Sequence, residues 1–338
     1  MAKTIWDYIH EACTQCNMGI RSDIPPFTGN QDIESSLIDA GDRNRVLLFP
    51  GAFNPAHEGH LQLLESILTA TKKTLSIRGV VIVPHDDEQV QDKTMEEPAT
   101  LDLAKSQRST LWRRAVGFPE NKAWIFTGSR SALAMFQEQL QDNLRKENIS
   151  LTFLLLVGAD WISTRAIYDP GEWNCSEAIT SDVSRPVDFR CEYTLRQMPG
   201  CFEWVQVVFG EDTDDLSRGS LQLTCRPNVM EGVSLWSALT VRRPLRRYYF
   251  VPCRRPCSPD TPYPSSTRIR QRIFEARAAR LPVDEDVLAT ALSQDILLGY
   301  VRGSVDSLDG DGERAEDEDA GNDDDATRHC QVVIRSSL

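Results

Sequence analysis

The sequence has no hydrophobic run long enough to cross a bilayer. The longest, residues 151–159, is far short of the roughly 20 residues that a membrane span needs. The first residues carry Asp7 and no apolar segment, so we expect neither a secretory signal nor a membrane partner. The odd number of cysteines, nine, indicates reduced thiols. We therefore expect a cytoplasmic protein, with nuclear import through the arginine-rich residues 242–247 as an alternative.

Ligand sets for a protein-bound metal are also missing. Two cysteines lie close together in sequence at 13 and 16, and two more at 253 and 257. Neither set is accompanied by a second tight pair or by His-x3-His. We therefore expect no metal site made of side chains. The turn after the first apolar run carries neither Gly-Lys-Ser/Thr nor Gly-x-Gly-x-x-Gly, which argues against the two commonest phosphate-binding loops there.

The composition excludes fibrous, coiled-coil and wholly disordered proteins, since 41% of the residues are hydrophobic and 26% are charged. Charge, however, is unevenly placed. Residues 306–325 hold eleven acidic residues and one Arg, so this segment carries −10 of the formal net charge of −13. We expect residues 304–338 to form an acidic, disordered tail. Residues 241–280 hold eleven Arg against Asp260 and Glu275, which predicts an anionic ligand, most simply phosphate.

Short apolar runs alternate with helical patterns from residue 45 onward. Strands are predicted at 45–50, 79–84, 123–127, 151–157, 204–209, 221–225 and 247–252. Helices are predicted at 5–16, around 61–68, and at 101–116, 131–148, 267–279 and 283–298. This alternation is typical of βαβ units. We expect an α/β protein with a Rossmann-like, doubly wound parallel sheet of five or six strands and helices on both faces.

The domain organisation follows from the same patterns. We expect an N-terminal extension with one helix over residues 1–40, because a Pro-Pro and Gly-Asn stretch separates it from the first strand. The domain itself is expected over 41–303, with polar, Gly- and Asp-rich insertions within 170–247.

Histidine is scarce, with five residues in 338, yet two lie three apart in Gly51-Ala-Phe-Asn-Pro-Ala-His-Glu-Gly-His60. This segment stands where the first strand ends and a helix begins, and ligands bind at that edge of a parallel sheet. His57 and His60 can both face a phosphate chain there, with help from the helix N-terminus. The alternative is a plain strand-to-helix turn with two surface histidines.

The segment resembles the His-x-Gly-His signature of the nucleotidyltransferase superfamily, the cytidylyltransferase-like enzymes that attack the α-phosphate of ATP or CTP and expel pyrophosphate. Ser265-Ser-Thr-Arg-Ile-Arg270 is similar to the Ser-Ser-Thr-x-Ile-Arg of the nicotinate and nicotinamide mononucleotide adenylyltransferases. The same segment is typical of a helix N-cap. The free backbone N–H groups at the start of such a helix and the Ser and Thr hydroxyls suit phosphates. Gly158-Ala-Asp160 resembles the Gly-Ala/Ser-Asp motif of these enzymes, Arg108 the Arg that opens their third helix, and Cys225-Arg-Pro227 the Arg of their next strand.

The resemblance implies transfer of AMP from ATP to nicotinamide or nicotinate mononucleotide, giving NAD or deamido-NAD, with Mg²⁺ carried mainly by the phosphates. It implies catalytic roles for His57, His60 and Arg270. It implies nucleotide contacts for Gly51, Ala52, Phe53, Asn54, Gly158, Asp160, Ser265, Ser266 and Thr267. It implies mononucleotide contacts for Trp161, Trp173 and Arg226.

The chain departs from the family pattern at the mononucleotide end. Trp124 matches the first residue of a Trp-x5-Trp-Glu pattern, but Arg130 and Ser131 stand at the other two positions. His85-Asp-Asp-Glu follows the second strand in place of a lysine-rich segment. A sister nucleotidyltransferase with another phosphate acceptor and a non-catalytic nucleotide-binding module therefore stay open. We expect ATP and a mononucleotide as partners and no specific nucleic acid, and we leave a homo-oligomer open.

Overall fold

The computed structural model describes residues 3–18, 37–38, 40–41, 43–94, 101–192, 194–207, 234–253 and 263–306. Residues 1–301 form one compact unit and residues 302–338 a second. The strand expected at 221–225 and nearly all of the expected acidic tail lie outside the described residues. Among the described helices, none is both long and apolar enough to span a membrane.

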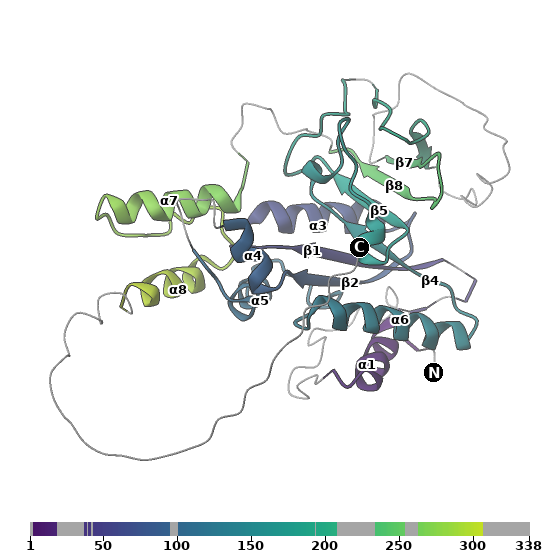
Figure 1. Ribbon diagram of the computed structural model, residues 1–338, viewed down its shortest axis with the longest axis horizontal. Helices are drawn as coiled ribbons and strands as arrows, with labels where there is room; N and C mark the ends of the chain where they lie inside the picture. The colour runs from purple at the N-terminus through teal and green to yellow at the C-terminus, as the bar shows by residue number, and fades with distance from the viewer. Residues whose placement is uncertain are drawn as a thin grey trace, which may run out of the picture. The chain divides into compact units, whose positions relative to one another are not determined.

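The first unit is built on one sheet of eight described strands in the order β3-β2-β1-β4-β5-β8-β7-β6 (Figure 1). The strands are β1 (Asn44–Gly51), β2 (Ile77–Pro84), β3 (Ala123–Ile125), β4 (Leu151–Leu156), β5 (Glu177–Ser181), β6 (Val205–Val207), β7 (Leu235–Leu239) and β8 (Arg247–Val251). Neighbours from β3 to β8 pair in parallel, whereas β7 runs antiparallel to both β8 and β6. The Rossmann-like α/β fold is confirmed.

The predicted number of strands, five or six, was too low. Two strands that the sequence did not indicate, β5 and β7, lie within residues 170–247, where insertions were expected between other strands. Their sequences, Glu-Ala-Ile-Thr-Ser and Leu-Trp-Ser-Ala-Leu, mix polar and small residues and give no apolar run. Burial of Glu177 depends on a distant partner, since its carboxylate lies 2.7 Å from Arg45 Nε of β1.

Seven α-helices are described: α1 (Ile5–Gln15), α3 (Glu58–Thr71), α4 (Asp87–Thr94), α5 (Lys105–Arg113), α6 (Arg130–Lys146), α7 (Ser266–Ala278) and α8 (Gln294–Asp306). The helices predicted at 5–16, 61–68, 101–116, 131–148 and 267–279 are confirmed, with shifted ends. The prediction of one helix over 283–298 was wrong, because α8 begins only at Gln294. Helix α4 was not predicted.

Side chains of the central strands alternate between two cores, as the two-residue period of a strand requires. Val46 and Leu48 of β1 are buried against α1 and α6, whereas Leu47 and Phe49 are buried on the face of α3 and α5. Figure 1 shows α1 beside α6 on one face of the sheet. The first helix is therefore part of the core of the first unit, although the sequence placed it in an extension.

The strand order sets the position of a ligand site. The chain goes from β1 outward to β2 and β3 and then returns to β4 on the other side of β1. Where the order reverses in this way, a crevice opens at the carboxyl ends of the strands. Helix α7, distant in sequence, is attached at the same edge, because Ser266 Oγ donates a hydrogen bond to the Pro55 carbonyl at 2.8 Å.

Candidate active site

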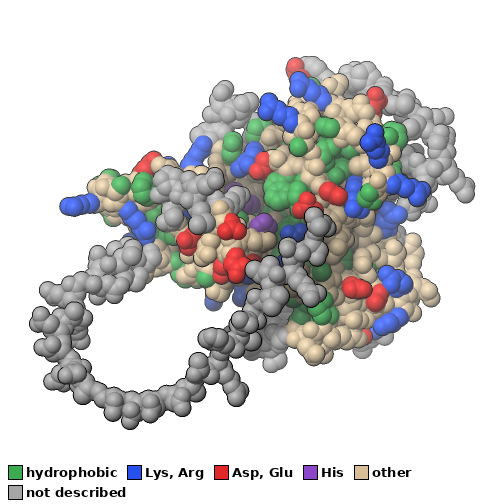
Figure 2. All heavy atoms as spheres, viewed as in Figure 1, with side chains coloured by type: hydrophobic (Ala, Val, Ile, Leu, Met, Phe, Trp, Pro, Cys, Tyr) green, Lys and Arg blue, Asp and Glu red, His purple; other side chains and the backbone are tan. Residues whose placement is uncertain are grey.

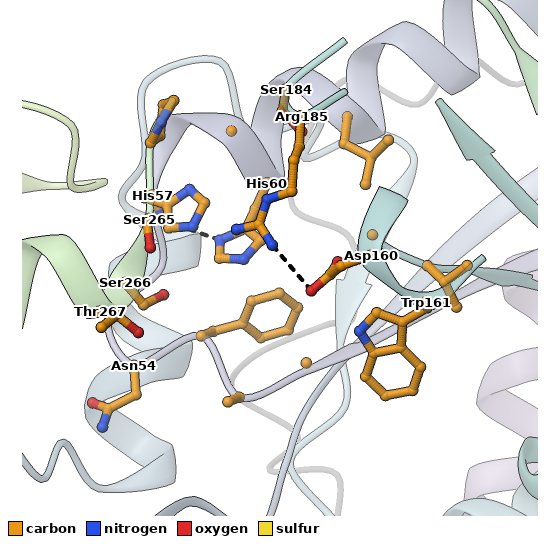
Figure 3. A pocket seen from close by; sticks show the side chains of 18 of the residues that line it. Asn54, His57, His60, Asp160, Trp161, Ser184, Arg185, Ser265, Ser266 and Thr267 are labelled. Atoms are coloured by element: carbon orange, nitrogen blue, oxygen red, sulfur yellow. Dashed lines mark hydrogen bonds and ion pairs between the residues drawn. The ribbon is translucent and has the colours of Figure 1, made fainter. Parts of the chain in front are cut away.

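A cavity of about 330 Å³ lies at the carboxyl ends of β1 and β4. Six segments line it: the turn after β1, the first turn of α3, the end of β2 with the start of α4, the turn after β4, the loop after β5 and the start of α7. Figure 2 shows histidine side chains within a hollow of the molecular face, and Figure 3 shows the cavity from close by. The predicted site residues in its lining are Gly51, Ala52, Phe53, Asn54, His57, His60, Gly158, Asp160, Trp161, Ser265, Ser266, Thr267 and Arg270.

The turn after β1 is held in an uncommon conformation. Phe53 has a φ of 49°, in the left-handed region that non-glycine residues rarely adopt. Its ring folds back over Gly51, where a Cβ atom would come within 2.7 Å of ring carbons. Asn54 is buried, and its Nδ2 donates to the Leu101 carbonyl at 2.7 Å. The Asn54 amide thus fixes the turn.

The two histidines of the motif form a stacked pair at the start of α3. Their ring centroids lie 3.6 Å apart, with 20° between the planes. Nδ1 of His60 accepts a hydrogen bond from the His57 backbone N–H at 3.2 Å. In neutral His60 the ring proton therefore sits on Nε2, which makes that atom a donor. The ring of Phe53 contacts His60 edge-on, with centroids 5.0 Å apart, and holds it in place.

His57 is electrically neutral at ordinary pH. The residue is 6% exposed, and its Nδ1 is buried without a hydrogen-bond partner. Burial, and after it the positive charge of Arg185, lowers the pKa of His57 to about 3. A neutral imidazole with an unpartnered polar atom fits a hydrogen-bonding contact to an anionic ligand better than it fits a salt bridge.

Two helix N-termini meet at the cavity. Residues of the first turns of α3 and α7 line it together, and such ends carry free N–H groups and partial positive charge. Arg270 joins the two: its Nη1 donates to the Asn54 carbonyl and its Nη2 to Thr267 Oγ1 at 3.2 Å. The arginine is buried and adds a positive charge to this wall. The wall as a whole suits a chain of phosphates.

The opposite wall follows β4. Gly158 precedes a short 3₁₀ turn, Ala159–Trp161, in which Asp160 reaches into the cavity with a 52% exposed side chain. Asp160 Oδ2 lies 3.0 Å from Nη1 of Arg185, which comes from the loop after β5. Trp161 stands edge-on to Tyr168, with ring centroids 4.4 Å apart. This wall therefore offers a carboxylate and an indole beside the phosphate-type wall.

Residues 48–272, well over half of the chain, match the family model described as cytidylyltransferase-like. The chain belongs to the cytidylyltransferase-like family. It is thus a nucleotidyltransferase by family. No curated protein matches the chain. Among solved structures it is similar to Plasmodium falciparum nicotinic acid mononucleotide adenylyltransferase complexed with NaAD, at 14% identity, covering 78% of this chain and 96% of that one with a TM-score of 0.37.

One predicted contact of this cytidylyltransferase-like chain, Trp173, is not brought to the cavity. Trp173 is 5% exposed and lies behind the lining, where its ring stacks on His85 with centroids 5.8 Å apart. The guanidinium of Arg130 lies 4.4 Å from the centre of the same ring, and the indole N–H donates to Tyr168. His85, not Trp173, is the lining residue here. Another predicted contact, Arg226, lies outside the described residues.

Sequence reasoning missed His85, Ser184 and Arg185, all of which line the cavity. A signal for Arg185 was present. The resemblance to the Arg of the family's next strand was drawn at Cys225-Arg-Pro227, but the sequence has an Arg-Pro pair at Arg185-Pro186 as well. The strand in question is β5, which gives no apolar run, so the pair behind it was overlooked.

Arg108 holds the cavity edge together without lining it. The fully buried guanidinium donates to the carbonyls of Ala52 at 2.7 Å, His85 at 2.8 Å and Leu103 at 2.9 Å. It also pairs with the Asp87 carboxylate at 2.6 Å. One side chain thereby fixes the turn after β1 against the end of β2, and so positions two parts of the lining.

Proposed function

We propose that this cytidylyltransferase-like chain is an adenylyltransferase that transfers AMP from ATP to nicotinamide or nicotinate mononucleotide and releases pyrophosphate. The observation that carries the proposal is the convergence of the stacked His57–His60 pair with the N-termini of α3 and α7 on one cavity. Imidazole N–H, free backbone N–H groups and Arg270 are complementary to a triphosphate. The motif Gly158-Ala-Asp160 supports a mononucleotide on the facing wall.

The reaction needs positioning and charge stabilisation more than covalent chemistry from the protein. A phosphate oxygen of the mononucleotide attacks the α-phosphorus of ATP in line, and the bond to the oxygen that bridges to the β-phosphate breaks. The Nε2–H of His60 donates to a non-bridging α-phosphate oxygen, where negative charge grows. His57 and Phe53 keep that ring oriented by stacking and edge contact. The Ser266 and Thr267 N–H groups hold the leaving pyrophosphate.

A divalent cation is proposed to enter with the triphosphate. Within the described residues, no three His, Cys, Asp or Glu side chains are grouped so as to hold a metal ion. Asp160 is the one carboxylate among the described residues of the lining, and it is engaged with Arg185. Phosphate oxygens are the usual main ligands of Mg²⁺ in such sites. When bound, Mg²⁺ neutralises part of the phosphate charge.

A second candidate is transfer to a different phosphate acceptor. It is favoured by the placement of Trp173, whose ring is engaged by His85 and Arg130 behind the cavity wall. The pyridine ring of a mononucleotide would then have Trp161 as the aromatic side chain of the facing wall. Acceptor profiling separates this candidate from the first.

The test is an assay of ATP, Mg²⁺ and nicotinamide mononucleotide, with NAD read through alcohol dehydrogenase. Nicotinate mononucleotide is run in parallel with pyrophosphate release as the readout. His60→Ala should lower kcat by about 10²–10³, the usual cost of a lost transition-state donor. His10→Ala, on the exposed side of α1, is the matched control and should retain full activity.

Dinucleotide formed by the wild type and His10→Ala but not by His60→Ala supports the proposal. Bound ATP without product from either mononucleotide contradicts it and shifts the weight to another acceptor. If no acceptor yields product, the chain is a nucleotide-binding module.

A further inference from the structure

Arg185 spans the cavity from one wall to the other. Figure 3 shows its side chain running from beside Ser184 to a guanidinium that meets Asp160. The ion pair with Asp160 is 3.0 Å long, and the two side chains are 32% and 52% exposed. The guanidinium also lies 4.8 Å from the ring centre of Tyr263, just before α7. Arg185 therefore pairs with Asp160 on the wall that follows β4, while its positive charge also lies near the start of α7 on the opposite wall.

The loop that carries Arg185 is anchored on both sides. Asp182, 1% exposed, accepts a hydrogen bond from the Cys253 N–H at 2.6 Å and pairs with Arg190. Ser184 abuts the start of α3, since a Cβ atom on Gly59 would come within 3.3 Å of the Ser184 Cβ. A fixed backbone with a long, partly exposed side chain leaves the guanidinium free to exchange partners.

The ion pair between Arg185 and Asp160 is weak. An ion pair whose members are a third to a half exposed stabilises by a few-fold at most in an equilibrium constant, because water screens it. A phosphate group carries more charge and accepts two parallel hydrogen bonds from a guanidinium. A triphosphate lying along His57, His60 and the start of α7 brings such a group within reach of Arg185.

We propose that Arg185 binds the triphosphate by exchanging Asp160 for a phosphate, and that this exchange frees the Asp160 carboxylate for the second substrate. A freed carboxylate accepts hydrogen bonds from hydroxyl groups, such as those of a ribose. The first substrate thus raises the affinity for the second. The second half of this inference rests on the proposed function, because it assumes a ribose-bearing acceptor.

The phosphate half is tested by equilibrium binding without turnover. Calorimetry measures α,β-methylene-ATP with Mg²⁺, whose scissile link is blocked, and inorganic tripolyphosphate. Arg185→Gln should weaken both by about tenfold or more, as expected for a lost charge-assisted hydrogen bond. Arg165→Gln, an exposed residue outside the lining, makes the same change of charge and should alter them less than about twofold. Equal effects of the two variants overturn the proposal.

Exchange, as distinct from simple charge, is tested through Asp160. Asp160→Asn should tighten triphosphate binding by about two- to fivefold, since the competitor of the phosphate is gone. In the Arg185→Gln background the same change should have no effect. An equal gain in both backgrounds shows that Asp160 acts through its charge alone, and overturns exchange. Thermal unfolding of each variant checks that it is folded, and Arg185→Lys should bind with intermediate affinity.

The coupling half is measured with nicotinamide mononucleotide as the probe. Its affinity should rise about two- to fivefold in the presence of α,β-methylene-ATP in the wild type, and not in Arg185→Gln. No rise in the wild type overturns the coupling. The proposed function fails separately, by absence of dinucleotide product, because the Arg185 dependence of tripolyphosphate binding needs no acceptor and no turnover.

Discussion

The imidazole rings of His57 and His60 lie nearly face to face, 3.6 Å apart at their centroids, at the first turn of α3. Two charged rings would repel strongly at this distance. The structure avoids the repulsion by burying His57, whose pKa falls to about 3, chiefly through desolvation and then through Arg185. His57 is therefore a neutral platform against which His60 is positioned.

The lowered pKa of His57 predicts a loss of stability in weak acid. In the unfolded chain a histidine takes up its proton near pH 6.5. In the folded protein His57 does not take up a proton until the pH approaches 3. Stability from this residue is thus complete above pH 6.5 and declines as the pH falls towards 3. Between pH 7 and pH 5 the contribution lost is about 2 kcal/mol, measurable by urea unfolding at each pH.

His57→Gln isolates this effect, because glutamine does not titrate. The free energy of unfolding of the variant should change less than that of the wild type between pH 7 and pH 5. His10→Gln, at the exposed surface of α1, should follow the wild type. Parallel curves for His57→Gln and the wild type contradict a neutral, buried His57.

Gly59 makes room for this pair. A Cβ atom on it would stand 3.2 Å from Cε1 and Nδ1 of His57 and 3.3 Å from the Ser184 Cβ. Gly59→Ala should displace the His57 ring by a few tenths of an ångström and should lower kcat by less than the roughly 10² that a 1 Å misplacement costs. The folded state should persist, because the contacts are tight but not overlapping. Steady-state kinetics and thermal unfolding of the variant check both expectations.

Gly299→Ala is the matched control for Gly59. It also lies in a helix, α8, and a Cβ atom there meets no atom within 4 Å. It should leave kcat unchanged and raise stability by about 0.5–1 kcal/mol through helix propensity. If Gly59→Ala behaves like Gly299→Ala, then Gly59 does not position the histidine.

The cavity lining formed by the turn after β1 and the starts of α3 and α7 was predictable, because each part is local in sequence. The segment from Gly51 to His60 and the one from Ser265 to Arg270 are short, and each places its residues by the geometry of one helix start. The segment after β5 was not predictable in this way. Arg185 reaches the cavity only because β5 joins the sheet, and β5 is buried through a pairing of Glu177 with Arg45, 132 residues earlier.

Trp173 is the opposite case, because it was predicted as a site residue and does not line the cavity. A sequence interval places it near Asp160 along the chain, but an interval does not say which side of a wall a ring occupies. Packing decides this, and the ring of Trp173 is covered by His85 and Arg130, which come from the ends of β2 and the start of α6. Tertiary contacts of this kind leave no periodic pattern in the sequence.

Arg108 should not tolerate replacement by lysine. Its guanidinium serves three carbonyls and one carboxylate at once, whereas an ammonium cannot reach all four. Arg108→Lys leaves a buried charge with too few partners, and we expect a loss of about 3 kcal/mol. The loss of activity should exceed what the fraction folded explains, because Ala52 and His85 are no longer fixed.

Arg114→Lys, the exposed residue at the end of the same helix, provides the comparison for Arg108. Its free energy of unfolding should stay within about 0.5 kcal/mol of the wild type. Urea unfolding and kcat/KM of both variants are measured side by side. Equal behaviour of the two lysine variants would mean that the Arg108 hydrogen bonds do not hold the cavity edge.

The first helix should contribute to the stability of the domain that carries the site. Trp6 of α1 is buried, and its indole lies over Gly79 of β2, where a Cβ atom would come within 2.6 Å of the ring. Trp6→Ala removes this packing and should cost about 3–5 kcal/mol, with kcat unchanged at 25 °C because α1 is not part of the cavity lining.

Gly79→Ala should also destabilise, since the added methyl group overlaps the indole. In the double variant the methyl group no longer meets a ring, so the second change should cost less than it does alone. Additive losses, or a Trp6→Ala variant that unfolds like the wild type, would mean that α1 is an appendage rather than part of the core.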